Sequence, residues 1–216
     1  MDVIFENLGL FGRGVLITLQ ISLYSGLGAL VLGTLMAGFR VSPTPPLRWV
    51  GTSWVTIFRN TPLTVVLFAI AFGLPEIGVN GTFFWFGVTG LALYTSAFVC
   101  EAVRSGINSV PPGQAEAARS VGLTFGQSLG LVVLPQAFRT VVPPLGNVFI
   151  AMIKNSAIVG AVGVGGDLYS AGIQLTGAGG FAALPVLTGV ALGYLLLTIP
   201  TGLLLGLVER KVTISR

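Results

Sequence analysis

Long stretches without a charged residue constrain this sequence more than any other feature. Residues 14–39 form a run of 26 residues, and residues 181–208 form a run of 28, in which Asp, Glu, Lys and Arg are absent. About 20 apolar residues suffice for a helix to cross the hydrocarbon core of a bilayer. A spanning segment must also satisfy its own backbone hydrogen bonds, so helices are expected here. A mean hydropathy of +0.92 and 31 glycines agree with a membrane protein.

Three further segments bring the predicted number of transmembrane helices to about five. Residues 83–100 contain no charge, and residues 141–165 form an apolar stretch interrupted by Pro143, Pro144 and Lys154. Each is long enough to cross a bilayer, with some tilt where it exceeds the thickness of the hydrocarbon core.

The second span is the least clearly marked of the five. The uncharged run 61–74 would be about 21 Å long as a helix, which is too short to cross the bilayer alone. We therefore expect this helix to begin near Thr56 and to carry Arg59 close to its cytoplasmic end. The sequence as a whole predicts an all-α integral membrane protein in which residues 14–209 form one transmembrane domain.

The remaining segments are expected outside the hydrocarbon core. Residues 1–13 open with acidic side chains rather than the basic region of a cleaved signal, and they are predicted to lie at the membrane interface. The glycine-rich residues 160–180 are interpreted as an outer or partly re-entrant loop, with Asp167 as a surface charge. Residues 210–216 are predicted to form a cytoplasmic tail.

The distribution of basic residues predicts the orientation. Five spans place the two termini on opposite sides of the membrane. With the N-terminus outside, only Arg13 among the clearly placed basic residues lies outside, as the positive-inside rule requires. The residues then placed inside are Arg40, Arg48, Arg59, Arg104, Arg119, Arg139, Arg210, Lys211 and Arg216. Residues 101–139 are therefore expected in the cytoplasm.

That interior segment has a composition unlike the rest of the chain. It holds five charged side chains in a protein with only 8% charged residues. Glu116 and Arg119 are spaced to pair at i,i+3 on a helix. Small side chains are frequent around them, and small residues let another protein approach the backbone closely. We interpret residues 101–139 as a docking element.

Local signals within this segment predict a helix, a turn and a second helix. Pro112 can begin a helix without losing a hydrogen bond, and Gly122 can end it in the left-handed conformation. Thr124 and Gln127 are spaced as a capping box that begins a second helix. Pro135 is expected to mark the place where that second helix ends or kinks.

The spacing of residues in this loop resembles that of a known family. The residues that carry the resemblance are Glu116, Ala117, Ala118, Gly122, Leu134 and Pro135. They are similar to the EAA loop of membrane subunits of ATP-binding-cassette (ABC) importers. Further residues resemble the polar amino acid branch of these permeases, notably Tyr94, Glu101, Arg104, Gly106, Ile107, Gly113, Gln114 and the run from Phe58 to Pro62. One position departs from the usual pattern, since Val132 stands where isoleucine is commoner.

The resemblance, which covers roughly residues 18–209, implies a function and a set of partners. Members of this family are permease subunits of the bacterial cell membrane that work as identical or related pairs. The loop would couple the permease to a cytoplasmic ATPase subunit, which binds ATP and Mg, and a substrate-binding protein would deliver the cargo outside. The family branch implies polar amino acids as cargo, with glutamate or glutamine favoured.

The sequence contains no chemistry for hydrolysing ATP itself. A phosphate-binding P-loop needs Gly-Lys before Ser or Thr, and neither Lys154 nor Lys211 follows a glycine. Without histidine, and with a single cysteine, metal sites and histidine-based catalysis are disfavoured. The basic residues are spread singly, which argues against a nucleic-acid interface. We therefore expect a transport subunit rather than an enzyme.

A polar trio inside the fourth predicted span is the candidate for the translocation path. Lys154 lies beside Asn155 and Ser156, and a lysine near mid-membrane costs about 2.5–3.5 kcal/mol on insertion scales. Lys154 should therefore face protein or water, either lining the path or pairing with an acidic residue of another subunit. Arg59 either extends to the interface or lies with Thr61 at the inner mouth of the path. Both alternatives remain open.

Two other interpretations come from the sequence. Glu101 and Arg104 are expected to form a local i,i+3 ion pair where the third span ends. A stand-alone ion-coupled secondary carrier or channel would also explain the apolar spans and the intramembrane lysine. It would not explain the small-residue helix–turn–helix. The sequence names neither the cargo amino acid nor whether the paired permeases are identical.

Overall fold

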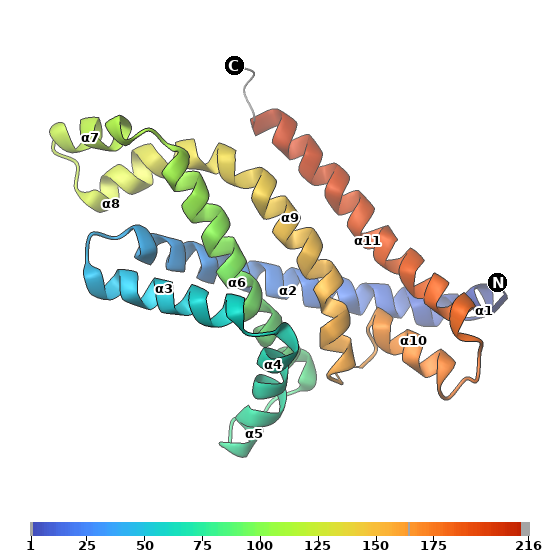
Figure 1. The fold of residues 1–216 in the computed structure, drawn as a ribbon. Helices are drawn as coiled ribbons and strands as arrows, with labels where there is room; N and C mark the ends of the chain where they lie inside the picture. Colours follow the sequence, from blue (N-terminus) through green and yellow to red (C-terminus); the bar gives the residue numbers. More distant parts are fainter. Residues whose placement is uncertain (1, 164, 213–216) are drawn as a thin grey trace.

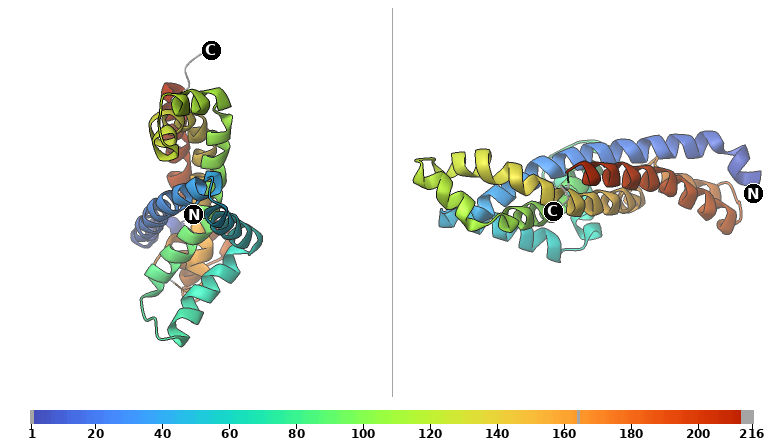
Figure 2. Two further views of the ribbon diagram at one scale, coloured as in Figure 1. Left: turned by 90° about the vertical axis from the view of Figure 1, so that its left-hand side faces the viewer. Right: turned by 90° about the horizontal axis from the view of Figure 1, so that it is seen from above.

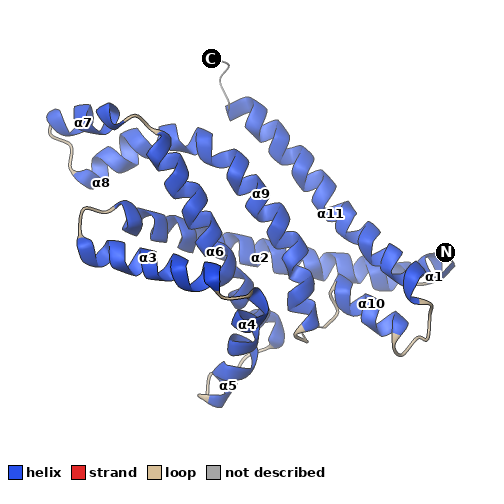
Figure 3. Ribbon diagram, viewed as in Figure 1, coloured by secondary structure: helices blue, strands red, loops and turns tan. Residues whose placement is uncertain are grey.

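The computed structural model describes residues 2–163 and 165–212, and within these residues every regular element is helical (Figure 3). The elements, drawn in Figure 1, are α1 (Asp2–Glu6), α2 (Leu8–Val41), α3 (Pro45–Asn60), α4 (Leu63–Phe68), the π-helix η1 (Ala69–Gly73), α5 (Leu74–Glu76), α6 (Phe83–Ser109), α7 (Pro112–Ser120), α8 (Phe125–Ser128), the π-helix η2 (Leu129–Val133), α9 (Leu134–Ala161), α10 (Leu168–Thr176) and α11 (Ala183–Val212).

Within the described residues, four helices are long and apolar enough to cross a membrane. They are Leu8–Val41, Phe83–Ser109, Phe125–Ala161 and Ala183–Lys211, and a bent helix pair raises the number to five if it forms one span. An all-helical fold with about five spans was predicted from the uncharged stretches; the structure confirms that the fold is all-helical and gives four to five candidate spans.

The bent pair corrects the prediction for the second span. α3 begins at Pro45 rather than near Thr56, and the chain turns by 106° between α3 and the helix that follows. The break lies at Thr61, whose backbone is extended with φ −98° and ψ 130°. A residue that precedes proline is driven out of the helical region, and Pro62 follows directly.

The fourth span also differs from its predicted bounds. The helical segment begins at Phe125, well before residue 141, and ends at Ala161. It continues through Pro135, Pro143 and Pro144 without a break in the helix. In place of a helix end, the π-helix η2 precedes Pro135, and in Figure 1 the chain bends there. Prolines in spanning helices are tolerated where local π adjustments and neighbouring helices satisfy the freed backbone groups.

The core lies where α6 packs between α2 and α9. These two helix pairs make the largest interhelical contacts in the described residues. Leu91, Val99 and Cys100 of α6 are completely buried, and Val159 of α9 is buried with them. Figure 2 shows an elongated molecule in which the α7–α8 loop and the N-terminus lie at opposite ends. The loop is thus joined to the two helices at the centre of the fold.

α11 buries little of its apolar surface. Large side chains along its length are exposed, including Leu184, Leu196 and Leu203. A contiguous apolar surface of this kind marks contact with lipid or with another protein. The structure gives the same picture for much of α2, where Leu23 and Val31 are exposed.

Asp167 is not the surface charge that the sequence suggested. Its residue is 1% exposed, and its carboxylate caps α10 by accepting hydrogen bonds from the Tyr169 backbone N–H at 3.0 Å and from the Ser170 hydroxyl. The glycine-rich segment therefore contains a capped helix. A carboxylate at a helix N-terminus is stabilised both by these bonds and by the helix dipole.

Candidate functional site

The interior polar segment folds as the predicted helix–turn–helix. α7 begins at Pro112 and ends in a Schellman motif, in which Leu123 N–H donates to Ala118 O at 3.2 Å and Gly122 N–H donates to Arg119 O at 3.0 Å. Gly122 has a φ of +92°, the left-handed conformation that favours glycine. The glycine at position 122 therefore determines the conformation of this turn, as the sequence predicts.

The second helix of the loop begins with the predicted capping box. Gln127 N–H donates to Thr124 Oγ1 at 3.3 Å, and Thr124 N–H donates to Gln127 Oε1 at 2.9 Å. These reciprocal bonds satisfy two backbone donors at the helix start. α8, η2 and α9 then run on as one helical segment, so the loop is attached directly to the fourth span.

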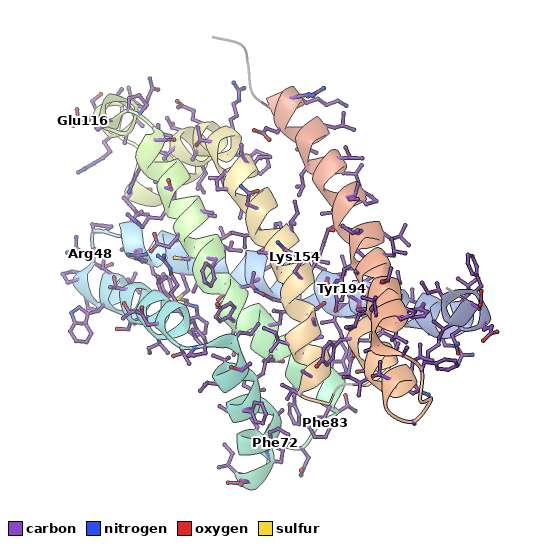
Figure 4. All side chains as sticks on the ribbon, turned by 45° about the vertical axis from the view of Figure 1, so that its right-hand side comes forward. Arg48, Phe72, Phe83, Glu116, Lys154 and Tyr194 are labelled. Carbon is purple, nitrogen blue, oxygen red and sulfur yellow. The ribbon has the colours of Figure 1, made fainter. Side chains whose placement is uncertain are left out.

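The loop presents one edge of α7 to solvent. Glu116 is exposed at the end of the molecule (Figure 4). Ala117 is also exposed, whereas Ala118 is buried against the loop. The predicted ion pair between Glu116 and Arg119 is wrong, because the structure forms no salt bridge between them within 4.0 Å. Glu116 thus keeps a carboxylate that is available to a partner.

The other residues that carry the resemblance to the EAA loop lie after α7 and at the start of α9. Gly122 and Pro135 are exposed, and Leu134 is half-buried. Leu134 and Pro135 open α9 directly after η2. The set therefore lies at one end of the molecule, with exposed and buried members (Figure 1).

Glu101 is the centre of an ion network that joins three helices. The predicted pair with Arg104 is confirmed, with Arg104 Nη2 2.9 Å from Glu101 Oε2. The other carboxylate oxygen contacts Arg40 of α2 and lies 3.6 Å from Arg59 Nη1 of α3. Sequence reasoning missed the last two partners because they are distant along the chain.

Arg59 lies between the ion network and an aromatic side chain. Its guanidinium carbon is 5.8 Å from the ring centroid of Phe98, a distance at which a cation is attracted to the ring face. Its side chain is 48% exposed. Arg59 therefore has both a carboxylate and a ring as partners within this chain and still reaches solvent.

A cavity of about 310 Å³ lies between α6 and α9. Its polar lining residues are Tyr94 and Thr95 from α6, and Asn147 and Asn155 from α9. Phe98, the ring under Arg59, also lines it. A small number of polar groups in a largely apolar cavity is typical of a site for a small solute.

The structure separates the residues of the predicted polar trio. Asn155 lines the cavity, Lys154 is exposed on α9, and Ser156 is 1% exposed with its hydroxyl donating to Ile153 O at 2.7 Å (Figure 4). Successive helical residues differ in direction by about 100° because a turn takes 3.6 residues, so three consecutive side chains cannot share one face. Thr61, the other predicted residue, is half-buried at the break after α3.

A second group of buried polar side chains was missed by sequence reasoning. Thr18 of α2 is completely buried and accepts a hydrogen bond from Leu168 N–H at 3.1 Å. Asp167 and Ser156 are buried in the same part of the fold, and the hydroxyl of Tyr194 lies near Thr18 and Ser156. Only the isolated Asp167 in an apolar region could have indicated this group.

No set of residues suited to a metal ion is present in the described part of the chain. Within residues 2–163 and 165–212, His, Cys, Asp and Glu form no group of three or more that could hold a metal. The chemistry of the site consists of arginines, carboxylates, amides and hydroxyls.

These features together define the class of a helical membrane protein with several spans and a structured polar loop. Solved transporters share this fold. The structure matches a chain from a crystal structure of an amino acid ABC transporter with histidines, with a TM-score of 0.86, 34% identity and 97% of each chain covered. It also matches a chain of the MetNI methionine ABC transporter in an inward-facing conformation, with a TM-score of 0.80, 26% identity and 96% and 98% covered.

The sequence matches the family model described as binding-protein-dependent transport system inner membrane component over residues 29–214, and the chain belongs to this family. It is 40% identical over 211 residues to the probable glutamine ABC transporter permease protein GlnM of Bacillus subtilis, covering 98% of this chain and 97% of that protein. It is also 40% identical over 214 residues to the glutamate transport system permease protein GluC of Corynebacterium efficiens, covering 93% and 92%.

Family membership confirms the class of protein predicted from the sequence. The chain is an inner-membrane permease subunit of a binding-protein-dependent ABC transporter, a complex that includes an ATPase. As a permease subunit, it is a component for transport and not the ATPase itself.

Proposed function

We propose that this chain forms the translocation path for polar amino acids in an ATP-driven importer, with glutamate or glutamine as the favoured cargo. The observation that carries the proposal is similarity along nearly the whole chain to permeases named for glutamine and glutamate. A third relative, the glutamate/aspartate import permease protein GltJ of Escherichia coli, is 35% identical over 218 residues. Because these relatives are named for different amino acids, their similarity supports the class of polar amino acids more strongly than any single amino acid.

Coupling to the ATPase is assigned to the α7 loop. Glu116 and Ala117 would contact the ATPase, Ala118 would hold α7 against the rest of the loop, and Gly122 would keep the turn in the shape that presents this edge. The loop connects α6 to α9, and these helices pack along each other at the centre of the fold. A displacement of α7 would therefore reach both core helices at once. Leu134 and Pro135 would transmit it where the loop enters α9.

The path is assigned to the surface around the α6–α9 cavity. Asn155 lines this cavity, and Arg59 lies beside its Phe98 wall. Lys154 would face the path from the adjoining surface of α9, while Thr61 lies at the break that ends α3. Ser156 would act from the interior, by holding α9 in place.

A second group of polar residues lies on α3. Arg48, Thr52, Ser53 and Thr56 line a hollow of about 470 Å³ on α3, together with Pro45, Trp49 and Ile57. A row of hydroxyl groups is unfavourable against lipid, because polar side chains in a membrane face the bundle interior or a water-filled cavity. We therefore assign this side of α3 to the water-filled part of the path.

The complete transporter would contain two permease subunits, identical or related, and two ATPase subunits that bind ATP and Mg. With the N-terminus outside, residues 101–139 would face the cytoplasm and meet the ATPase. A substrate-binding protein would dock on the outer side. Membrane lipid would surround the exposed leucines of α2 and α11.

Reconstitution tests this function directly. The chain would be purified with its ATPase and placed in liposomes with the binding protein, and uptake of labelled glutamine, glutamate, arginine and methionine would be compared. We expect ATP-dependent uptake of glutamine or glutamate ahead of methionine. Solute movement by this chain alone, without an ATPase, would instead favour an ion-coupled carrier.

A further inference from the structure

A small cavity lies on the inner side of the α7–α8 loop. Its volume is about 240 Å³. Its walls come from the ends of α2 and α6, the connection between α6 and α7, and the helices α7, α8 and η2. Its lining residues are Val41, Ile107, Asn108, Val110, Pro111, Pro112, Ala115, Arg119, Phe125, Ser128, Leu129 and Val133. It shares no lining residue with the α6–α9 cavity or with the exposed Glu116 edge of α7.

Ser128 gives this cavity a group that lacks a partner. The residue is 3% exposed, and its hydroxyl makes no hydrogen bond in the structure. In the described part of the chain only one other buried side-chain polar atom shares this condition, the distant Tyr194 hydroxyl. A buried hydroxyl without a partner is unfavourable, so a bound group that pairs with it would be stabilised.

The remaining polar lining residues restrict the chemistry of such a group. Arg119 carries a positive charge and five N–H donors, and Asn108 carries an amide, while no acidic residue lines the cavity. Arg119 also forms no ion pair with the described residues. The other walls are apolar. The complementary ligand is thus an anion with an apolar body, and the space equals about eight water molecules of roughly 30 Å³ each.

We propose that this cavity binds a small amphiphilic anion, a carboxylate whose head lies between Arg119 and Ser128 and whose apolar part lies against Phe125, Leu129 and Val133. The bound molecule would bridge α7 to the ends of α2 and α6. Its site is separate from the path and from the docking edge proposed above, so it goes beyond the transport function. The carboxylate could come from the cytoplasm or from the adjoining bilayer leaflet, since both offer the same head and an apolar chain.

Thiol labelling of the assembled transporter in nanodiscs tests the site. Ser128→Cys would be placed in a Cys100→Ala background and reacted with an anionic sulfonatoethyl and a cationic trimethylammonioethyl methanethiosulfonate. Ser120→Cys, an exposed neighbour of Arg119 on the same helix, is the matched control for the intrinsic reagent rates and the general potential. After this normalisation we expect at least a fivefold preference for the anionic reagent at Ser128→Cys. Adding Arg119→Gln should remove that preference.

Protection by ligands identifies the source. Butanoate remains in water and dodecanoate enters the bilayer, and at least fivefold slower labelling with either one supports the site and shows which side supplies the ligand. Butylammonium, of matched size and opposite charge, should not protect. If neither carboxylate slows labelling, or if Ser128→Cys reacts with no reagent, the proposal is wrong. If Ser128→Cys does not assemble, Asn108→Cys at the exposed rim provides the same comparison and the same criteria.

Discussion

Arg104 holds Glu101 with two hydrogen bonds, from Nε at 3.2 Å and from Nη2 at 2.9 Å to the same carboxylate oxygen. This leaves the other oxygen to Arg40, with Arg59 at 3.6 Å. One carboxylate is therefore shared by three guanidinium groups from α2, α3 and α6. The network lies on α6 shortly before this helix leads into the loop, so it fixes the position from which the loop departs.

Glu101→Gln should destabilise the protein, because three neighbouring cations would lose their shared anion. Glu101 is about a fifth exposed, and solvent screening limits the loss to about 1–3 kcal/mol of unfolding free energy. Thermal unfolding of the purified permease in detergent measures the effect. Glu209→Gln, at the exposed end of α11, is the control and should leave the midpoint unchanged. Equal unfolding midpoints for the two variants would show that the ion network does not stabilise the fold.

Gly122→Val should uncouple ATP hydrolysis from uptake while the protein still inserts into the membrane. The φ of +92° is strained for any L side chain, by about 1–2 kcal/mol, although a Cβ there would meet no atom within 4 Å. The expected change is therefore a reshaped turn and not a collision. ATPase rate and uptake would be measured in the same vesicles.

Gly113→Ala provides the control for this loop variant. A Cβ added at Gly113 would also meet no atom within 4 Å, but the φ of this residue is not positive. The variant should keep the wild-type ratio of uptake to hydrolysis. Unchanged transport by Gly122→Val would falsify the assignment of the loop to ATPase docking.

Gly160→Ala should disturb the packing of α10 against α9. A Cβ at this position would overlap the carboxylate oxygens of Asp167, which are buried and engaged in capping. Overpacking of this kind costs about 1–3 kcal/mol. We expect a lower midpoint of thermal unfolding and faster proteolysis within residues 163–182. Gly206→Ala on α11, where a Cβ meets nothing within 4 Å, should show neither change.

Lys154→Met should impair uptake without releasing the ATPase. Lys154 is exposed on α9 and forms no ion pair in the described structure, so removing its charge should affect the path more than the fold. Lys154→Arg retains the charge and should recover most of the uptake rate. Both the maximal rate and the half-saturating concentration of cargo would be measured. Normal kinetics for the methionine variant would exclude Lys154 from the path.

Features encoded by neighbouring residues were predictable from the sequence. The capping box of Thr124 and Gln127 and the turn at Gly122 depend on residues a few positions apart, and both are present. The uncharged stretches likewise predicted about five spans, and the structure has four to five candidates. Thr61 and Pro62 carried a signal for the break after α3, because a residue before proline avoids the helical region. The prediction that placed a helix across them did not use it.

Features that depend on distant pairing were not predictable. Arg40 and Glu101 are 61 positions apart, and which arginines reach the carboxylate depends on how α2 and α3 cross α6. Asp167 looked like a loop charge because its burial depends on how α10 packs against Gly160 of α9, although its hydrogen-bond partners, Tyr169 and Ser170, are close in the sequence. The separation of Lys154, Asn155 and Ser156 followed from helical geometry alone and could have been anticipated.

The close packing of three helices around Asp167 and Leu168 limits how this permease can open. A Cβ added to Gly14 or to Gly193 would come within 2.9 Å of Leu168, and one on Gly160 would strike Asp167, so α2, α9 and α11 all close upon this dipeptide. Spreading these three helices apart would break the close packing around a buried carboxylate and a buried leucine. We therefore expect α2, α9 and α11 to move together as one block when the permease opens.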